Sequence, residues 1–268
     1  AVIEADIDED PDAESIPVCD FSGAVERLID LTPTIKGVFI QLDQAIRFQA
    51  GQYINLSIPI EDGMSRAFSL ANAPSSGSEI ELNVRIVPGG RGTAWVHENL
   101  KPDDRVRLSG PYGRFFVRKS SKLPMIFMAG GSGLSSPKSM ILDLLEESCA
   151  LPITLIYGQR TREELYYHEK FEVLAGRHPN FSYVPVLSHE PEGSAWNGAR
   201  GFAHEAAKRH FSNDFSGHKA YLCGPPPMID ACITALMQGR LFEKDIYTEK
   251  FFSAADVQLA RSPLFKRI

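Results

Sequence analysis

The spacing of hydrophobic positions divides the chain into two parts. Between residues 21 and 119, short apolar or alternating runs are separated by Gly, Pro, Asn and Asp, which is the pattern of strands joined by turns. We expect strands at 24–31, 37–42, 53–58, 67–70, 80–87 and 105–108, and one short helix at 94–99 with Thr93 as its N-cap. Six short strands of this kind predict an antiparallel β-barrel domain over 21–119.

From residue 120 the pattern changes to alternating strands and helices. Apolar runs predict strands at 125–128, 153–157, 182–186, 220–223 and 246–248, and helices between them at 138–149, 168–175, 202–210 and 228–237. This alternation predicts βαβ units and a parallel sheet covered on both faces, so we expect an α/β domain over 120–268. Ligands of such sheets bind at the carboxyl ends of the strands.

The first 20 residues follow neither pattern. They carry a nearly continuous acidic run made of Glu4, Asp6, Asp8, Glu9, Asp10, Asp12 and Glu14, which ends at Ile16 and Pro17. We interpret 1–20 as an extended linker or tail with solvated charges. Because the chain begins with Ala and not Met, we expect it to be a piece of a longer protein with an upstream domain.

Composition and charge exclude several classes of protein. The net charge is −6 without a cluster of basic residues, so nucleic acid is not an expected partner. No apolar run approaches the roughly 20 residues that span a bilayer, so no membrane is expected either. The chain has four cysteines, at positions 19, 149, 223 and 232. Their spacing matches neither a zinc site, nor a disulfide framework, nor a plant-type iron–sulfur cluster. We therefore expect no metal site in this chain and a reducing, cytoplasmic location.

One stretch of a predicted strand combines three groups that a flavin nucleotide requires. Arg66 offers a fork for phosphate, Phe68 a flat stacking surface and Ser69 a hydroxyl for hydrogen bonding. A glycine-rich turn over 88–93 leads into the predicted helix and is suited to a diphosphate. Its candidate residues are Gly90, Gly92 and Thr93.

A second nucleotide site is predicted in the α/β part. The strand at 125–128 runs into a glycine-rich loop and then a helix, an arrangement that lets a diphosphate approach the backbone and the helix N-terminus. The loop contains Gly130, Gly131, Ser132 and Gly133. A tight strand-to-helix turn without a ligand is the alternative. A later strand ends at Cys223, Gly224 and Pro225, which place a thiol at the carboxyl edge; a small buried core residue is the alternative for Cys223.

These motifs occur in an order that resembles a known family. The segments are 66–69, 90–93, 130–135, 223–225 and 249–251, and in this order the chain resembles the ferredoxin–NADP reductase superfamily over about 21–252. The acidic linker, the phrase at 131–138 and the ending at 249–252 resemble the reductase components of bacterial multicomponent phenol hydroxylases and related toluene and methane monooxygenases. In that group an iron–sulfur domain precedes the linker, so the resemblance implies a [2Fe-2S] centre only in a missing upstream domain.

The resemblance implies roles around FAD. Arg66 would neutralise the diphosphate with Gly90, Gly92 and Thr93, while Ala67 lies within the motif and Val87 would hold the flavin from the strand edge. Phe68 would stand against the ring system, and many relatives have Tyr there, so a hydroxyl contact is lost in this chain. Ser69 would reach flavin N5, Glu249 would be a polar neighbour, and Phe251 would cover the ring face. Ser69, Cys223 and Glu249 are the expected catalytic group.

The resemblance also implies roles around the nicotinamide nucleotide. Its diphosphate would lie on 130–133, with Cys223, Gly224 and Pro225 near the nicotinamide. His189 and Glu190 follow the strand at 182–186, where NADPH-dependent relatives tend to show Ser-Arg, and therefore favour NADH. Arg160 and Arg162 could still bind a phosphate, or lie in a solvated loop.

The implied function is an FAD-dependent NADH reductase. Electrons would pass from NADH through FAD to a [2Fe-2S] domain and on to a phenol-type aromatic monooxygenase component. A stand-alone ferredoxin or flavodoxin reductase and a non-catalytic nucleotide-binding subunit are the alternatives. The acidic linker argues against the first, and Ser69, Cys223 and Glu249 argue against the second, because a docking protein does not need them.

Overall fold

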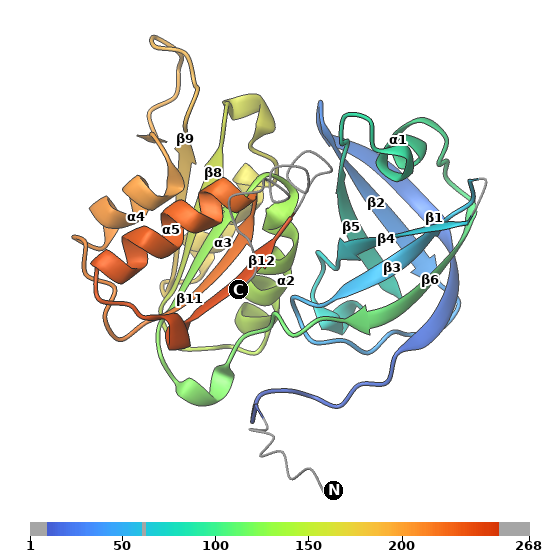
Figure 1. The fold of residues 1–268 in the computed structure, drawn as a ribbon, viewed down its shortest axis with the longest axis horizontal. Coiled ribbons are helices and arrows are strands. Elements are labelled where there is room, and N and C mark those ends of the chain that lie inside the picture. Colours follow the sequence, from blue (N-terminus) through green and yellow to red (C-terminus); the bar gives the residue numbers. More distant parts are fainter. Residues whose placement is uncertain (1–9, 61–62, 252–268) are drawn as a thin grey trace, which may run out of the picture.

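The computed structural model describes residues 10–60 and 63–251 of the chain (Figure 1). An antiparallel sheet and a parallel sheet with helices lie side by side, which confirms the predicted fold class. None of the helices in the described ranges is long and apolar enough to cross a membrane. Residues 1–9 and 252–268, and with them the first acidic positions and the expected segment after Phe251, lie outside the described residues.

The antiparallel sheet has the strand order β4-β3-β6-β1-β2-β5. Its strands are β1 (Cys19–Thr32), β2 (Ile35–Leu42), β3 (Tyr53–Ile58), β4 (Met64–Ser69), β5 (Glu79–Arg85) and β6 (Arg105–Tyr112). A bridge between Leu70 and Leu82 joins the two outer strands, so the sheet closes on itself as the alternation predicts. Alternate residues of every strand point inward and form one apolar cluster with Val96 of α1 (Arg91–Glu98).

The parallel sheet has the order β10-β9-β8-β7-β11-β12. Its strands are β7 (Met125–Gly130), β8 (Ile153–Gln159), β9 (Phe181–Leu187), β10 (Ala199–Arg200), β11 (Lys219–Gly224) and β12 (Ile246–Lys250). Helices α2 (Ser135–Glu146) and α3 (His168–Arg177) contribute to the apolar cluster on one face. Helices α4 (Ala203–His210) and α5 (Pro226–Gln238) cover the other face. Short 3-10 helices cover Pro74–Ser76, Lys119–Ser121, Gly131–Leu134, Arg162–Glu164 and Glu243–Asp245.

The first helix differs from its prediction. It begins at Arg91, and Gly90 is its N-cap. Thr93 lies in the first turn, where its Oγ1 donates to the Gly90 carbonyl (3.2 Å) and accepts from the Val87 amide (3.1 Å). The prediction that Thr93 caps the helix is therefore wrong, because the hydroxyl closes the preceding turn instead. The two-residue strand β10 was not predicted, since two residues carry no periodicity.

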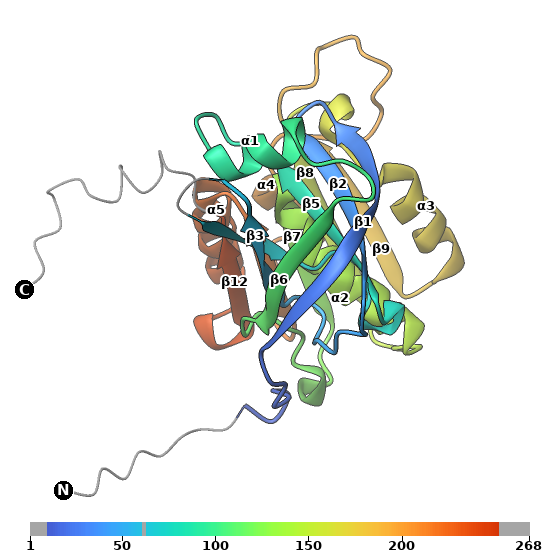
Figure 2. The same cartoon turned by 90° about the vertical axis from the view of Figure 1, so that its right-hand side faces the viewer.

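The acidic segment before β1 contacts both parts of the chain where the structure describes it. The Asp10 carboxylate pairs with Arg118 (2.8 Å), and Asp12 accepts from the amide and hydroxyl of Ser120 (2.8 and 2.6 Å). Glu14 pairs with Arg47 before β3 (2.7 Å). Figure 2 shows the path of this segment below β1 and β6. Asp10 is largely removed from solvent by its pair, with 18% of its side chain exposed, which differs from the prediction, whereas the Glu14 side chain is 49% exposed.

A buried ion pair joins the two sheets. Lys138 of α2 is 1% exposed and Glu81 of β5 is 7% exposed, and their Nζ and Oε2 atoms are 2.5 Å apart. Lys138 also donates to the Ala71 carbonyl (2.9 Å), and the Tyr167 hydroxyl donates to Glu81 Oε1 (2.7 Å). Burial lowers the pKa of Lys138 to about 8, while the charge of Glu81 opposes this shift. The pair and its hydrogen bonds fix α2 against the barrel.

Replacing one partner of this pair should destabilise the protein strongly. We expect Lys138→Met to lower the free energy of unfolding by about 3–5 kcal/mol, because a buried Glu81 carboxylate loses its countercharge. Lys138→Met with Glu81→Gln should recover much of that loss. Urea unfolding measures both, with exposed Lys101→Met as the control, expected within about 0.5 kcal/mol of the parent. Equal stability of Lys138→Met and the control would contradict this account.

Candidate active site

The three residues predicted to be catalytic converge on one carboxylate oxygen. Glu249 Oε2 accepts from the Ser69 hydroxyl (3.3 Å) and from the Cys223 thiol (3.6 Å). Cys223 and Glu249 are register partners on neighbouring parallel strands, β11 and β12, while Ser69 ends β4 of the barrel. The structure therefore brings a barrel residue to the carboxyl edge of the parallel sheet, where ligands of such sheets bind.

A fourth residue of this group was missed in the sequence. The Ser136 hydroxyl donates to the same Glu249 oxygen at 2.8 Å, the shortest of the three contacts. Ser136 is fully buried in the first turn of α2, directly after the glycine-rich loop. Its position after that loop is the one signal that could have indicated it, but a serine in a first helical turn is most often interpreted as a local contact.

Burial controls the ionisation of this group. It raises the pKa of the Glu249 carboxyl above its usual range, while the donors Ser136, Cys223 and Ser69 oppose that shift. It also raises the pKa of the Cys223 thiol well above its usual range, and the nearby Glu249 adds to the effect. Cys223 is therefore a neutral hydrogen-bond donor at physiological pH and not a thiolate nucleophile.

Arg66 and Gly92 meet as the motifs predict. A Cβ added to Gly92 would lie 3.0 Å from Arg66 Cγ, so the glycine makes room for the arginine at the first turn of α1. The Arg66 side chain is exposed, and its guanidinium donates a hydrogen bond to the Ser65 carbonyl (2.8 Å). A guanidinium beside free amides of a helix N-terminus fits a diphosphate. The residues present therefore fit the phosphate end of a flavin nucleotide.

Other predicted flavin residues are partly engaged within the protein. The Val87 amide donates to Thr93 and its carbonyl accepts from the Gly90 amide (2.8 Å), so both groups close their own turn. Phe68 is half-buried and packs against the barrel cluster, while Ala67 is exposed. Only part of the Phe68 ring therefore remains for stacking on a ligand.

The glycine-rich loop lies against the end of β11. A Cβ on Gly130 would meet Met228 Sδ at 2.4 Å, and one on Gly133 would meet the Cys223 carbonyl oxygen at 2.5 Å. A Cβ added to Gly224 would likewise lie 3.0 Å from the Gly130 carbonyl oxygen. These glycines are therefore required by packing, while Ser132 and Pro225 flank the same edge of the sheet. The loop and the end of β11 therefore pack directly against each other.

A barrel arginine also reaches this loop. Gly131 has a φ of 59°, and a Cβ there would lie 2.9 Å from Arg85 Nη1 at the end of β5. Arg85 forms no ion pair with any of the residues that the structure describes. The sequence did not single it out, because nothing in a strand pattern shows that the end of β5 faces a loop of the other sheet. Its guanidinium provides positive charge where a diphosphate was predicted.

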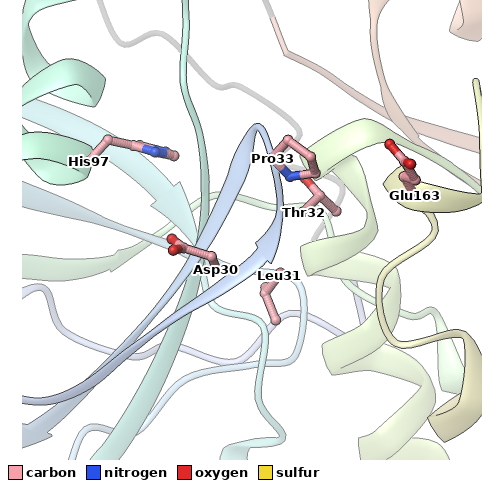
Figure 3. Close-up of a pocket in the computed structure, with 6 residues that line it drawn as sticks. All are labelled: Asp30, Leu31, Thr32, Pro33, His97 and Glu163. Atoms are coloured by element: carbon pink, nitrogen blue, oxygen red, sulfur yellow. The ribbon is translucent and has the colours of Figure 1, made fainter.

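Two of the four candidate residues for the adenosine end, Arg162 and Glu190, line a separate cavity, while Arg160 and His189 do not. This cavity has a volume of 650 Å³ and is lined by Thr161, Arg162, Glu163, Glu190 and Pro191. The Arg162 amide donates to the Glu190 carboxylate (2.8 Å), and the His189 amide donates to the carbonyl of exposed Arg160 (2.8 Å). A neighbouring cavity of 670 Å³ shares Glu163. Figure 3 shows Thr32 and Pro33 at the tip of the β1–β2 hairpin opposite Glu163, and Asp30, Leu31 and His97 also line this cavity.

Phe251 extends the last strand past the site. Its amide donates to the Gly224 carbonyl (3.0 Å), and its ring is half-buried against the cluster that contains Cys223. The residue predicted to cover a flavin ring therefore lies beside the catalytic group.

Comparison with known proteins agrees with this geometry. The family model for the oxidoreductase FAD-binding domain matches residues 32–117, and the one for the oxidoreductase NAD-binding domain matches residues 127–233. The protein is therefore an oxidoreductase that binds FAD and NAD in a ferredoxin reductase-like fold. More narrowly, the chain belongs to the family of reductase components that includes those of phenol hydroxylases.

Three relatives support this assignment. The phenol 2-monooxygenase reductase component DmpP of Pseudomonas sp. (strain CF600) is 60% identical over 269 residues, covering 100% of this chain and 76% of the relative. The phenol hydroxylase P5 protein of Acinetobacter pittii (strain PHEA-2) is 54% identical over the same share of each chain. The crystal structure of the reductase GcoB of Amycolatopsis superposes with a TM-score of 0.81 at 32% identity, covering 88% of this chain and 70% of that chain.

The contact between Gly133 and Cys223 should resist any side chain. We expect Gly133→Ala to lower the free energy of unfolding by about 1–3 kcal/mol, because two backbone segments must separate. Gly176→Ala is the matched control, since a Cβ at this helical position meets nothing within 4 Å and should leave stability unchanged or higher. Urea unfolding compares the two. A Gly133→Ala variant as stable as the control would show that the loop is free to move from β11.

Proposed function

We propose that Arg66, Ser69, Cys223 and Glu249 align a flavin and a nicotinamide for hydride transfer. The observation that carries the proposal is the meeting of Ser69 with Cys223 and Glu249, because it joins the predicted flavin strand to the predicted nicotinamide edge. The chemistry that bound FAD supplies is the conversion of a two-electron hydride donor into single electrons. The protein's residues hold the two rings in register, which is a positioning effect.

The remaining assignments follow from the same arrangement. The first turn of α1, with Arg66, Gly90, Gly92 and Thr93, holds the FAD diphosphate, and Phe68, Ala67, Val87 and Phe251 surround the ring system. The loop 130–133 holds the NADH diphosphate between the segment 223–225 and Arg85. Two arginines support these roles: Arg66 lies beside Gly92 and Arg85 lies beside Gly131. Because glycine has no side chain, each guanidinium can lie close to the backbone where a diphosphate would bind.

The acceptor is proposed from the relatives. We assign it to a [2Fe-2S] domain that delivers electrons to a phenol-type aromatic monooxygenase, because the relatives with 60% and 54% identity are phenol hydroxylase components. A cytoplasmic location is supported by four free cysteines, which suit a reducing compartment.

NADH, more than NADPH, should bleach the flavin. The pure chain with FAD should be yellow, and anaerobic NADH should remove the absorbance of the oxidised flavin, followed by stopped-flow spectroscopy. We expect NADPH to act at least about tenfold more slowly at equal concentration, because the Glu190 carboxylate repels a 2′-phosphate beside the 650 Å³ cavity. A colourless protein would refute the function, and a yellow protein that does not bleach would favour a non-catalytic subunit. Equal rates would overturn only the NADH preference.

Removing the Arg66 guanidinium should weaken FAD binding. We expect Arg66→Ala to raise the Kd for FAD by about 10-fold to 100-fold, the effect of losing charge-assisted hydrogen bonds to a phosphate. Fluorescence titration of the apoprotein with FAD measures the constant. Arg107→Ala, an exposed arginine on β6 of the same barrel, is the control and should bind FAD like the parent. Unchanged affinity in Arg66→Ala would remove this residue from the flavin site.

A further inference from the structure

The Glu249 carboxylate is held unevenly. Its three side-chain donors all converge on one oxygen, Oε2. The Ser136 hydroxyl is the nearest at 2.8 Å, against 3.3 Å for the Ser69 hydroxyl and 3.6 Å for the Cys223 thiol. A donor at 2.8 Å is within the range of a strong hydrogen bond to a carboxylate, while a thiol at 3.6 Å is a weak donor. Ser136 is therefore the dominant support of this carboxylate.

The position of Ser136 in the fold directs its hydroxyl at Glu249. Ser136 is fully buried, and its hydroxyl donates to Glu249 Oε2 at 2.8 Å while also lying close enough to the Cys223 thiol to oppose the rise in the pKa of that thiol. The next hydroxyl on the same helix, that of Ser139, is equally buried but donates to the Asn72 carbonyl (2.6 Å) and does not reach Glu249. Helix α2 thus carries three buried serines: Ser135 donates to the Ser132 carbonyl of the loop (2.9 Å), Ser136 serves the site and Ser139 serves the contact with the barrel.

Glu249 is the carboxyl group of this cluster, and burial raises its pKa above the usual range. The groups that face its carboxyl are Ser69 from β4, Ser136 from α2 and Cys223 from β11, and the pKa of the thiol is raised well above its usual range. Tyr166 lies behind Cys223 with a pKa that burial also raises, and its hydroxyl donates to the Gly131 carbonyl (3.1 Å). The neighbouring Lys250 pairs with Asp230 on α5 (2.6 Å) and is directed away.

We propose that Ser136 is a positioning residue, which holds the Glu249 carboxylate at the meeting point of Ser69 and Cys223 and stabilises its ionised form. The inference rests on the proposed function, in which nicotinamide lies beside Cys223. A nicotinamide ring becomes positively charged when the C4–H bond breaks and the hydride leaves with both electrons. A fixed carboxylate nearby favours that change, because charge is matched without reorganisation. Ser136 therefore acts on hydride transfer through Glu249, without touching either nucleotide.

The test compares Ser136→Ala and Ser136→Thr across pH. Burial raises the folded-state pKa of Glu249 above the usual 4.5, so the stability contributed by this group is complete at low pH and is lost as pH rises through the folded-state value. Removing the donor raises that value further. We expect the loss of stability in Ser136→Ala to be small at low pH and larger at high pH, and the pH at which the contribution of Glu249 is lost to move upward relative to the parent. Ser136→Thr keeps the hydroxyl and should follow the parent.

Two readouts separate the inference from the proposed function. Thermal unfolding of the chain at each pH, with and without added FAD, tests the link between Ser136 and Glu249 without turnover. The pH profile of NADH-dependent flavin reduction tests its consequence, and there Ser136→Ala should shift the limb of kcat assigned to Glu249 in the same direction, with KM for NADH changed less than kcat. Loss of FAD binding by the parent chain would refute the proposed function while leaving the unfolding test intact.

The controls make the result decisive. Ser139→Ala removes a buried hydroxyl from the same helix and should lower stability equally at every pH. In a Glu249→Gln background, Ser136→Ala should show no pH-dependent effect. If Ser136→Ala does not fold, Ser136→Cys keeps the volume with a weak donor and should give a smaller shift of the same sign. A loss of stability from Ser136→Ala that is the same at every pH, with an unmoved kcat profile, would overturn the inference.

Discussion

The ion pair between Lys138 and Glu81 is the constraint on which the site depends. It links the helix that follows the glycine-rich loop to the outer face of β5, opposite the side chains that fill the barrel, and both charges are removed from water. A buried pair of this kind tolerates little displacement, because each charge depends on its partner and on hydrogen bonds such as that from Tyr167. The same helix carries Ser136, so the orientation of α2 that satisfies Glu81 also sets the position of the donor to Glu249.

The acidic segment adds a second link between the two parts. Asp10 and Asp12 contact Arg118 and Ser120, which lie on the segment between β6 and β7, while Glu14 pairs with Arg47 of the barrel. The Arg118 guanidinium also stacks on the Phe116 ring, with 4.0 Å to the ring centre. Charges that look solvated in the sequence thus run along the junction of the two sheets.

The site itself combines polar groups with different tasks. Two arginines, Arg66 and Arg85, lie beside glycines at the two predicted diphosphate positions, and a neutral thiol and hydroxyls lie where the rings are expected to meet. This separation is consistent with an oxidoreductase whose cofactors carry the chemistry. The protein adds alignment and electrostatics, for which buried, hydrogen-bonded side chains are better suited than reactive ones.

The sequence by itself determined the two fold classes, the strand ends that carry Arg66, Ser69 and Cys223, and the glycine-rich turns, because periodicity and turn chemistry are local properties. Only the tertiary structure showed Ser136, Arg85 and the Lys138–Glu81 pair, and it corrected Thr93 and Asp10. The reason is physical: these contacts join residues from separate elements, as Ser69 and Glu249 do across 180 positions. Such pairs depend on how one sheet packs against the other, and no spacing along the chain encodes that angle.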